Sequence, residues 1–235
     1  MVSAGTVFRW ISEVIFRSIF AGDDTPFRHS TLLINTPLVV AQVLLASEGP
    51  TGVVVTMASL LAVHLMAGTS EALAYALIMT SLPAVWYFLT TLPFTTSLMA
   101  SAVIALRVIA VGSALLTFIY FLNPLELSML AHKLGLRKAS LYPAMTWKVT
   151  PHVMRDMKSA MLSAELKGEK LWKALAVTIL AVNEYSSMYE EGTYARMQDF
   201  KPRYWYDGKT VLVFTLILAV DIIVLLLLYL RMIPA

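Results

Sequence analysis

Three ionisable side chains lie inside long apolar stretches of the chain: His64, Arg107 and Asp221. Such a group is a candidate for proton transfer, for binding a polar ligand or for an ion pair, because an isolated charge in lipid is costly. Arg107 and Asp221 have opposite charges, so one expectation is that they pair with each other. Snorkelling of Arg107 toward the membrane surface is the alternative. For His64, a hydrogen-bonded structural role inside the helix bundle is the simpler interpretation.

The chain lacks the motifs of several common chemistries. It has no glycine-rich phosphate loop, no His-Glu-x-x-His helix, no Gly-x-Ser-x-Gly elbow and no dinucleotide-binding fingerprint. It has no cysteine, which excludes a disulfide framework, a thiolate metal site and a cysteine nucleophile. The four histidines are scattered along the sequence. We therefore expect this chain to bind no metal ion and no cofactor of its own.

Composition places the chain in a membrane. Of its 235 residues, 58% are hydrophobic and 14% are charged, and the mean hydropathy is +0.72. Soluble domains have about 45–50% apolar and about 25% charged residues, so the excess apolar surface must face lipid. The formal net charge of +3 is too small to suggest a nucleic-acid partner. We expect an all-α integral membrane protein.

Five segments are apolar enough to span a bilayer, which takes about 20 residues with a range of about 17–25. They are residues 30–47, 51–68, 72–92, 98–122 and 210–230. Short turn-forming breaks join the first four into two helical hairpins. The expected organisation is an interfacial N-terminal helix in 1–29, a four-span bundle in 30–122, a polar region in 123–209 and a C-terminal span in 210–235. Residues 171–186 form a sixth span if they enter the membrane.

The distribution of basic residues predicts the orientation. Residues 123–209 hold 13 of the 18 Lys and Arg residues, and Arg9, Arg17 and Arg28 precede the first span. Four spans return the chain to its starting side, so the positive-inside rule places both regions in the cytoplasm, with the protein in the plasma membrane. The side of the C-terminus stays open. Charges interrupt residues 7–20, which therefore do not fit a signal peptide; the helix expected there lies in the membrane interface or packs on its own protein.

The polar region is expected to form three helices. The first runs from Pro124 to a stop at Gly135, the second from Thr150-Pro151 to Gly168, and the third over 171–196. One face of the second helix carries a methionine stripe formed by Met154, Met157 and Met161. Such a stripe suits an adaptable partner surface; taken alone, packing on the protein's own helices is the favoured interpretation.

This layout resembles the transmembrane T subunit of energy-coupling factor (ECF) transporters, a family that includes the cobalt-uptake transmembrane subunits. The resemblance covers about Arg107 to Tyr204, with an Arg early in the fourth span, an Asn-Pro-led short helix and long amphipathic helices. The family has an Ala-Arg-Gly triplet at the ends of two coupling helices. The matching triplets here are Leu166-Lys167-Gly168 and Ala195-Arg196-Met197. Each keeps a basic residue, but the first has Leu and Lys for Ala and Arg, and the second has Met for Gly.

The resemblance implies a coupling subunit that is not itself an enzyme. Two cytoplasmic ABC ATPase subunits would bind ATP and Mg²⁺, and this chain would transmit their closure to a separate substrate-binding membrane subunit. The imported substrate would be a vitamin or a transition-metal ion, and nothing in the sequence selects one. Lys167 and Arg196 would each contact a carboxylate of an ATPase. A cation in the last turn of a helix also offsets the helix dipole by about 0.3–1 kcal/mol without any partner.

Two other functions stay open on sequence grounds. One is an intramembrane enzyme acting on a lipid or polyprenyl substrate, with His64, Arg107 or Asp221 in its site. Such an enzyme needs several convergent polar groups, and the sequence offers few. The other is a membrane-anchored scaffold with no transport role.

Overall fold

The computed structural model describes residues 4–20, 25–95, 97–136, 139–168, 171–196 and 206–233. All regular secondary structure in these residues is helical. The chain divides into two compact units. The bundle unit comprises Arg17–Asn123 and Trp205–Ala235, and the hairpin unit comprises Met1–Phe16 and Pro124–Tyr204. We describe each unit by itself.

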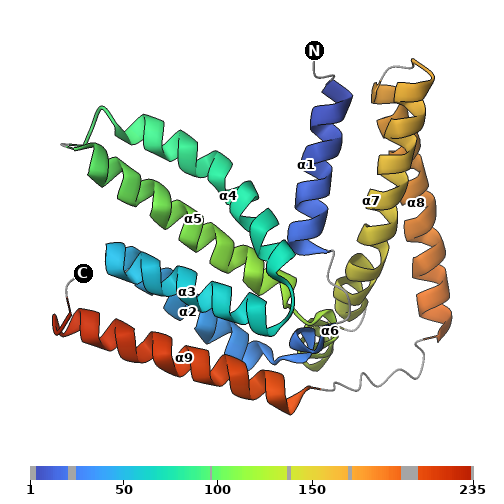
Figure 1. The fold of residues 1–235 in the computed structure, drawn as a ribbon. Helices are drawn as coiled ribbons and strands as arrows, with labels where there is room; N and C mark the ends of the chain where they lie inside the picture. Colours follow the sequence, from blue (N-terminus) through green and yellow to red (C-terminus); the bar gives the residue numbers. More distant parts are fainter. Residues whose placement is uncertain are drawn as a thin grey trace. The chain divides into compact units, whose positions relative to one another are not determined.

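Five helices form the bundle unit and lie side by side in Figure 1. They are α2 (Leu32–Glu48), α3 (Pro50–Met66), α4 (Ser70–Thr91), α5 (Leu98–Tyr120) and α9 (Gly208–Tyr229). In the described part of the chain, α4, α5 and α9 are long and apolar enough to cross a membrane, whereas α2 and α3 are shorter apolar helices of 17 residues each. The predicted all-helical membrane architecture is therefore confirmed at this level.

Local sequence signals set the ends of the bundle helices. The Thr31 side chain accepts a hydrogen bond from the Leu33 amide and caps α2. Between α2 and α3, Gly49 has a φ of 145°, which favours glycine, and Pro50 begins α3. Asp207 caps α9 by accepting hydrogen bonds from the Thr210 amide at 3.0 Å and the Thr210 hydroxyl at 2.7 Å. These bonds to the ionised form hold the pKa of Asp207 below its usual range.

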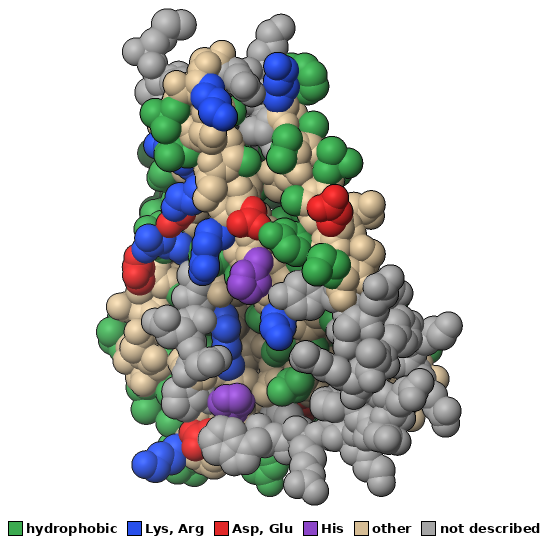
Figure 2. Space-filling view, turned by 90° about the vertical axis from the view of Figure 1, so that its right-hand side faces the viewer, with side chains coloured by type: hydrophobic (Ala, Val, Ile, Leu, Met, Phe, Trp, Pro, Cys, Tyr) green, Lys and Arg blue, Asp and Glu red, His purple; other side chains and the backbone are tan. Residues whose placement is uncertain are grey.

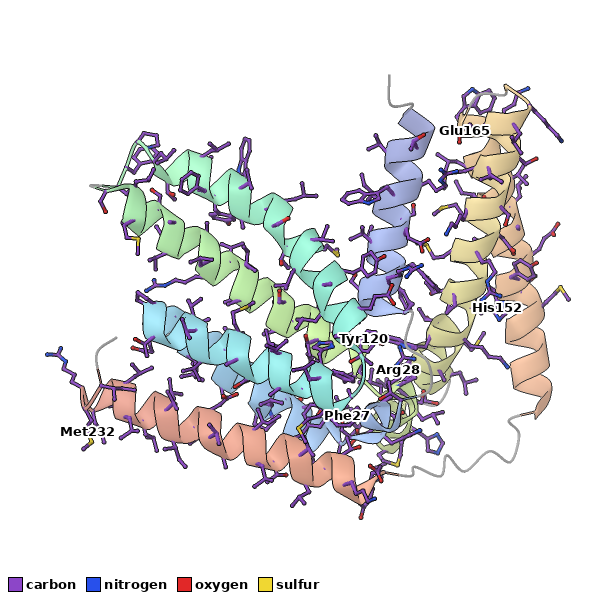
Figure 3. All side chains as sticks on the ribbon, in the orientation of Figure 1. Phe27, Arg28, Tyr120, His152, Glu165 and Met232 are labelled. Carbon is purple, nitrogen blue, oxygen red and sulfur yellow. The ribbon has the colours of Figure 1, made fainter. Side chains whose placement is uncertain are left out.

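Aromatic side chains fill one part of the bundle core. Phe121 is fully buried, and its ring centroid lies 6.0 Å from that of Phe27 and 5.8 Å from that of Phe214. Beside this cluster, Arg28 donates to the Tyr120 carbonyl at 3.2 Å and places its guanidinium 5.2 Å from the centroid of the Tyr120 ring (Figure 3). These contacts fix η1 (Pro26–His29) against α5 and α9.

The hairpin unit is built around two long helices, α7 (Tyr142–Leu166) and α8 (Leu171–Arg196), which pack side by side (Figure 1). Its other elements are α6 (Pro124–Lys133), η2 (Ala139–Leu141) and α1 (Ala4–Ile19) up to Phe16. The residue ranges predicted for α6 and α8 are confirmed. Charged and hydrophobic side chains are interspersed on the face shown in Figure 2, as expected for helices that are amphipathic rather than uniformly apolar.

The predicted start of α7 at Thr150-Pro151 is wrong. The helix begins eight residues earlier at Tyr142, with Pro143 in its first turn, and Pro151 lies inside it. A proline in the first turn loses no helical hydrogen bond, whereas an interior proline removes one. Pro143 therefore provides the start signal, and α7 continues through Pro151. Its end is as predicted, at Gly168, whose φ is +67°.

Candidate functional site

His64 is a fully bonded residue of the bundle core. Its side chain is 1% exposed; Nδ1 lies 3.0 Å from the Thr69 carbonyl oxygen and Nε2 lies 3.0 Å from Thr117 Oγ1. A carbonyl oxygen only accepts, so Nδ1 donates to Thr69 and Nε2 accepts from the Thr117 hydroxyl. Both ring nitrogens are thus occupied in joining α3 to α5. This arrangement matches the structural role expected for His64.

Asp221 lies in a polar cluster that joins three helices of the bundle. The carboxyl group is fully buried on α9 and its Oδ1 accepts a hydrogen bond from Ser59 Oγ on α3 at 2.6 Å. Gln42 on α2 is also buried, and its backbone carbonyl accepts from Thr56 Oγ1 at 3.1 Å. The expected pair with Arg107 is not formed, because the partner of Asp221 is the Ser59 hydroxyl.

Arg107 is half-buried on α5 and differs from the other polar residues of the bundle. Its Nε is buried, and the side chain makes no hydrogen bond or ion pair with any residue that the structure describes. Its neighbour one turn along, Ala110, packs against Ala46 and Val53, which offer no acceptor. On insertion scales a charged residue at mid-bilayer costs about 2.5–3.5 kcal/mol. Arg107 therefore places an uncompensated cation in the apolar bundle.

The three intramembrane candidates do not form one site. His64 binds Thr69 and Thr117, whereas Asp221 binds Ser59. Within the described residues, no group of three or more His, Cys, Asp or Glu side chains is arranged to hold a metal ion.

The methionine stripe of α7 faces the interior of the hairpin unit. Met161 is 2% exposed, and Met157 packs against it. Met154 is half-buried and lines a cavity of about 120 Å³ between α1 and α7. The lining side chains are Ser12, Glu13, Phe16, Met154, Arg155 and Lys158. The stripe is thus largely used in packing on the protein's own helices.

Ion pairs between α1 and α7 are a feature that the sequence reasoning missed. Glu13 pairs with Lys158, and Arg9 Nη1 lies 3.7 Å from Glu165 Oε2. Glu165 is labelled in Figure 3. Arg9 and Glu13 are four residues apart and so share one face of α1. In the sequence, that spacing indicates a charged face on this helix that can pair with charges on another helix. Trp10 remains 51% exposed.

The first of the two basic triplets forms the exposed end of α7. Leu166 is 80% exposed, Lys167 is exposed, and Gly168 adopts the left-handed conformation that ends the helix. Lys167 makes no ion pair with a described residue, so its ammonium group is available to an external partner.

The second triplet falls at the end of α8. The helix ends at Arg196, while Met197 and the side chains of Ala195 and Arg196 lie outside the described residues.

No protein-family model, curated protein or solved structure matches this chain.

Proposed function

We propose that this chain is the membrane coupling subunit of an ECF-type ABC importer. Two cytoplasmic ATPases would bind and hydrolyse ATP, and the hairpin unit would pass their movement to a membrane subunit that binds a vitamin or a transition-metal ion. The observation that carries the proposal is the exposed basic end of α7, at Leu166-Lys167-Gly168, on one of two long paired helices. The chain would itself be non-catalytic.

The charge at the end of α7 suits a contact with a carboxylate. Lys167 is exposed and has no ion-pair partner among the described residues, whereas nearby Glu165 is already paired with Arg9. Truncating one partner of a desolvated charge pair across an interface costs about 2–5 kcal/mol. Lysine is a point charge and cannot form the bidentate contact of arginine. The Lys167 contact is therefore the looser of the two proposed contacts, and Arg196 the tighter.

The proposed topology has α2, α3, α4, α5 and α9 crossing the plasma membrane. At 1.5 Å per residue, the 17 residues of α2 or α3 extend about 25 Å, which is the low end of what spans a bilayer. The basic residues of 123–209 place the hairpin unit in the cytoplasm in this proposal. Whether part of α8 enters the membrane as a sixth span is a separate question that accessibility labelling of its exposed Trp172 would answer.

The test is co-purification from the native membrane. The tagged wild-type chain, solubilised in mild detergent, is expected to bring two ATPase subunits with it, and the Lys167→Glu, Arg196→Glu double variant is expected to lose them. Lys133→Glu is the matched control, because Lys133 is an exposed residue of the same unit at the end of α6. Size-exclusion profiles and far-UV circular dichroism check that each variant is folded.

The outcomes are distinct. Absence of any ATPase with the wild type contradicts the proposed function. ATPases retained by the double variant contradict the assignment of the two basic residues as the contacts. The intramembrane-enzyme alternative would be favoured if His64→Ala abolished an activity on a lipid while bound partners were retained.

A further inference from the structure

Arg107 lies near the middle of the helix that carries it. It is nine residues from Leu98 and thirteen from Tyr120, which at 1.5 Å per residue corresponds to about 14 Å and about 20 Å from the two ends of α5. Arginine relieves its charge by snorkelling when it lies close to a helix end. At this depth the side chain cannot rely on the membrane surface, so its charge needs an acceptor within the apolar layer.

Several buried polar side chains of the bundle are bonded to other side chains of the chain. Thr80 Oγ1 and Ser113 Oγ, for example, lie 3.2 Å apart between α4 and α5. Arg107 has no such partner: its Nε is buried without a hydrogen bond, and no described residue forms an ion pair with it. Asp221, the acidic residue of the apolar helix α9, is fully buried and bonded to Ser59. In the described part of the chain, therefore, no acceptor is bonded to the guanidinium.

We propose that Arg107 is the docking contact for a carboxylate on a membrane helix of a partner subunit. The inference rests on the proposed function and assigns this surface to the substrate-binding membrane subunit. The guanidinium offers a planar fork of donors that matches a carboxylate bidentately, and the pair is stronger in a low-dielectric layer than in water. A lipid phosphate is the competing acceptor.

The experiment uses the complex purified from native membranes. Arg107→Glu is expected to reduce the membrane subunit recovered per chain by about tenfold or more, which is about 1.4 kcal/mol of binding free energy, while the ATPases stay bound. Arg107→Lys keeps the charge but not the fork, so a smaller loss is expected. Arg231→Glu is the control, since Arg231 is an exposed arginine just beyond α9. Thermal unfolding of each complex detects variants that are simply misfolded.

A photo-crosslinking residue in place of Val103, which lies one turn from Arg107 on the same face of α5, identifies the group that faces Arg107. The expected adduct is a membrane-helix peptide of the partner that contains Asp or Glu, and changing that carboxylate to Lys should restore binding to the Arg107→Glu chain. The same residue in place of Leu82, an exposed position on α4, is the control. Adducts to lipid alone, or an unchanged amount of membrane subunit recovered with the Arg107→Glu chain, would overturn this inference. If the ATPases are still bound in either case, the proposed function is not contradicted. Failure of the wild type to bring any ATPase would instead overturn the proposed function.

Discussion

A methyl group added at Gly112 should destabilise the bundle through a single contact with Thr80. A Cβ at Gly112 would lie 2.6 Å from Thr80 Cγ2 and 3.2 Å from Thr80 Cβ, against about 3.5–4.0 Å for a comfortable carbon–carbon contact. The Thr80 methyl cannot rotate away freely, because its Oγ1 donates to the Ala76 carbonyl at 2.9 Å and lies 3.2 Å from Ser113 Oγ. One helix would have to move by about 1 Å or Thr80 would lose these bonds.

The magnitude follows from two opposing terms. Overpacking a well-filled core costs about 1–3 kcal/mol, and replacing glycine by alanine in a helix recovers up to about 1 kcal/mol. Gly112→Ala is therefore expected to lower the free energy of unfolding by about 1–2 kcal/mol. Thr80→Ser removes the clashing Cγ2 and keeps the hydroxyl, so the double variant should recover most of the loss, with a coupling energy of about 1–2 kcal/mol.

The assay is equilibrium unfolding of the purified chain in mixed micelles, followed by far-UV circular dichroism as the fraction of denaturing detergent rises. Gly208→Ala is the control, because a Cβ there meets nothing within 4 Å; this variant should be as stable as wild type or up to about 1 kcal/mol more stable. A Gly112→Ala variant as stable as wild type would refute the close approach of α4 and α5. Additive effects of Gly112→Ala and Thr80→Ser would refute the specific contact.

Three further variants test other contacts. Gly52→Ala should cost about 3 kcal/mol or more and resist rescue by Leu45→Ala in the same unfolding assay, because the Cβ would lie 1.8 Å from the Leu45 backbone oxygen, which no side-chain change removes. Asp221→Ala should cost about 1–3 kcal/mol in that assay by removing a buried hydrogen-bond acceptor, and Asp221→Asn, which keeps an acceptor, should cost less. Hydrogen bonds lower the pKa of Asp207 in the folded state. The stability that the charged carboxylate contributes is therefore present above pH 3.8, the usual pKa of an Asp side chain, and is lost as the pH falls through the lowered pKa. Thermal unfolding from pH 7 into acid should therefore show wild type losing its advantage over Asp207→Asn only below about pH 4.

The helices of the bundle could be predicted because their signals are local. Hydropathy runs mark the spans, and the turn between α2 and α3 is marked by Gly49 and Pro50, whose backbone preferences act without tertiary context. The start of α7 could not be predicted in the same way. Pro143 and Pro151 each offer a proline for the first turn of a helix, and the sequence does not show that the helix starts at the earlier one and continues through the later one.

The failed pairing of Arg107 with Asp221 has a different cause. Hydropathy gives the depth of a residue in a membrane but not the direction in which its helix presents it. On α9, Asp221 and Phe214 are seven residues apart and share one face, and Phe214 packs in the aromatic cluster of the bundle. The packing of α9 therefore turns Asp221 inward, where Ser59 provides a donor at 2.6 Å. Helical spacing alone could have placed Asp221 inside, but it could not have named Ser59.

The same geometry bears on why Arg107 has no partner among the residues that the structure describes. Residues 107, 110 and 114 are three and seven apart, so they lie on one stripe of α5, and Ala110 and Ala114 on this stripe are fully buried. Arg107 thus lies on the packed stripe of the helix, and its Nε is buried. Alanine at these positions allows α2 and α3 to approach closely but offers no acceptor. For the acceptor that we propose, the depth of Arg107 favours a carboxylate on a neighbouring helix over a lipid headgroup.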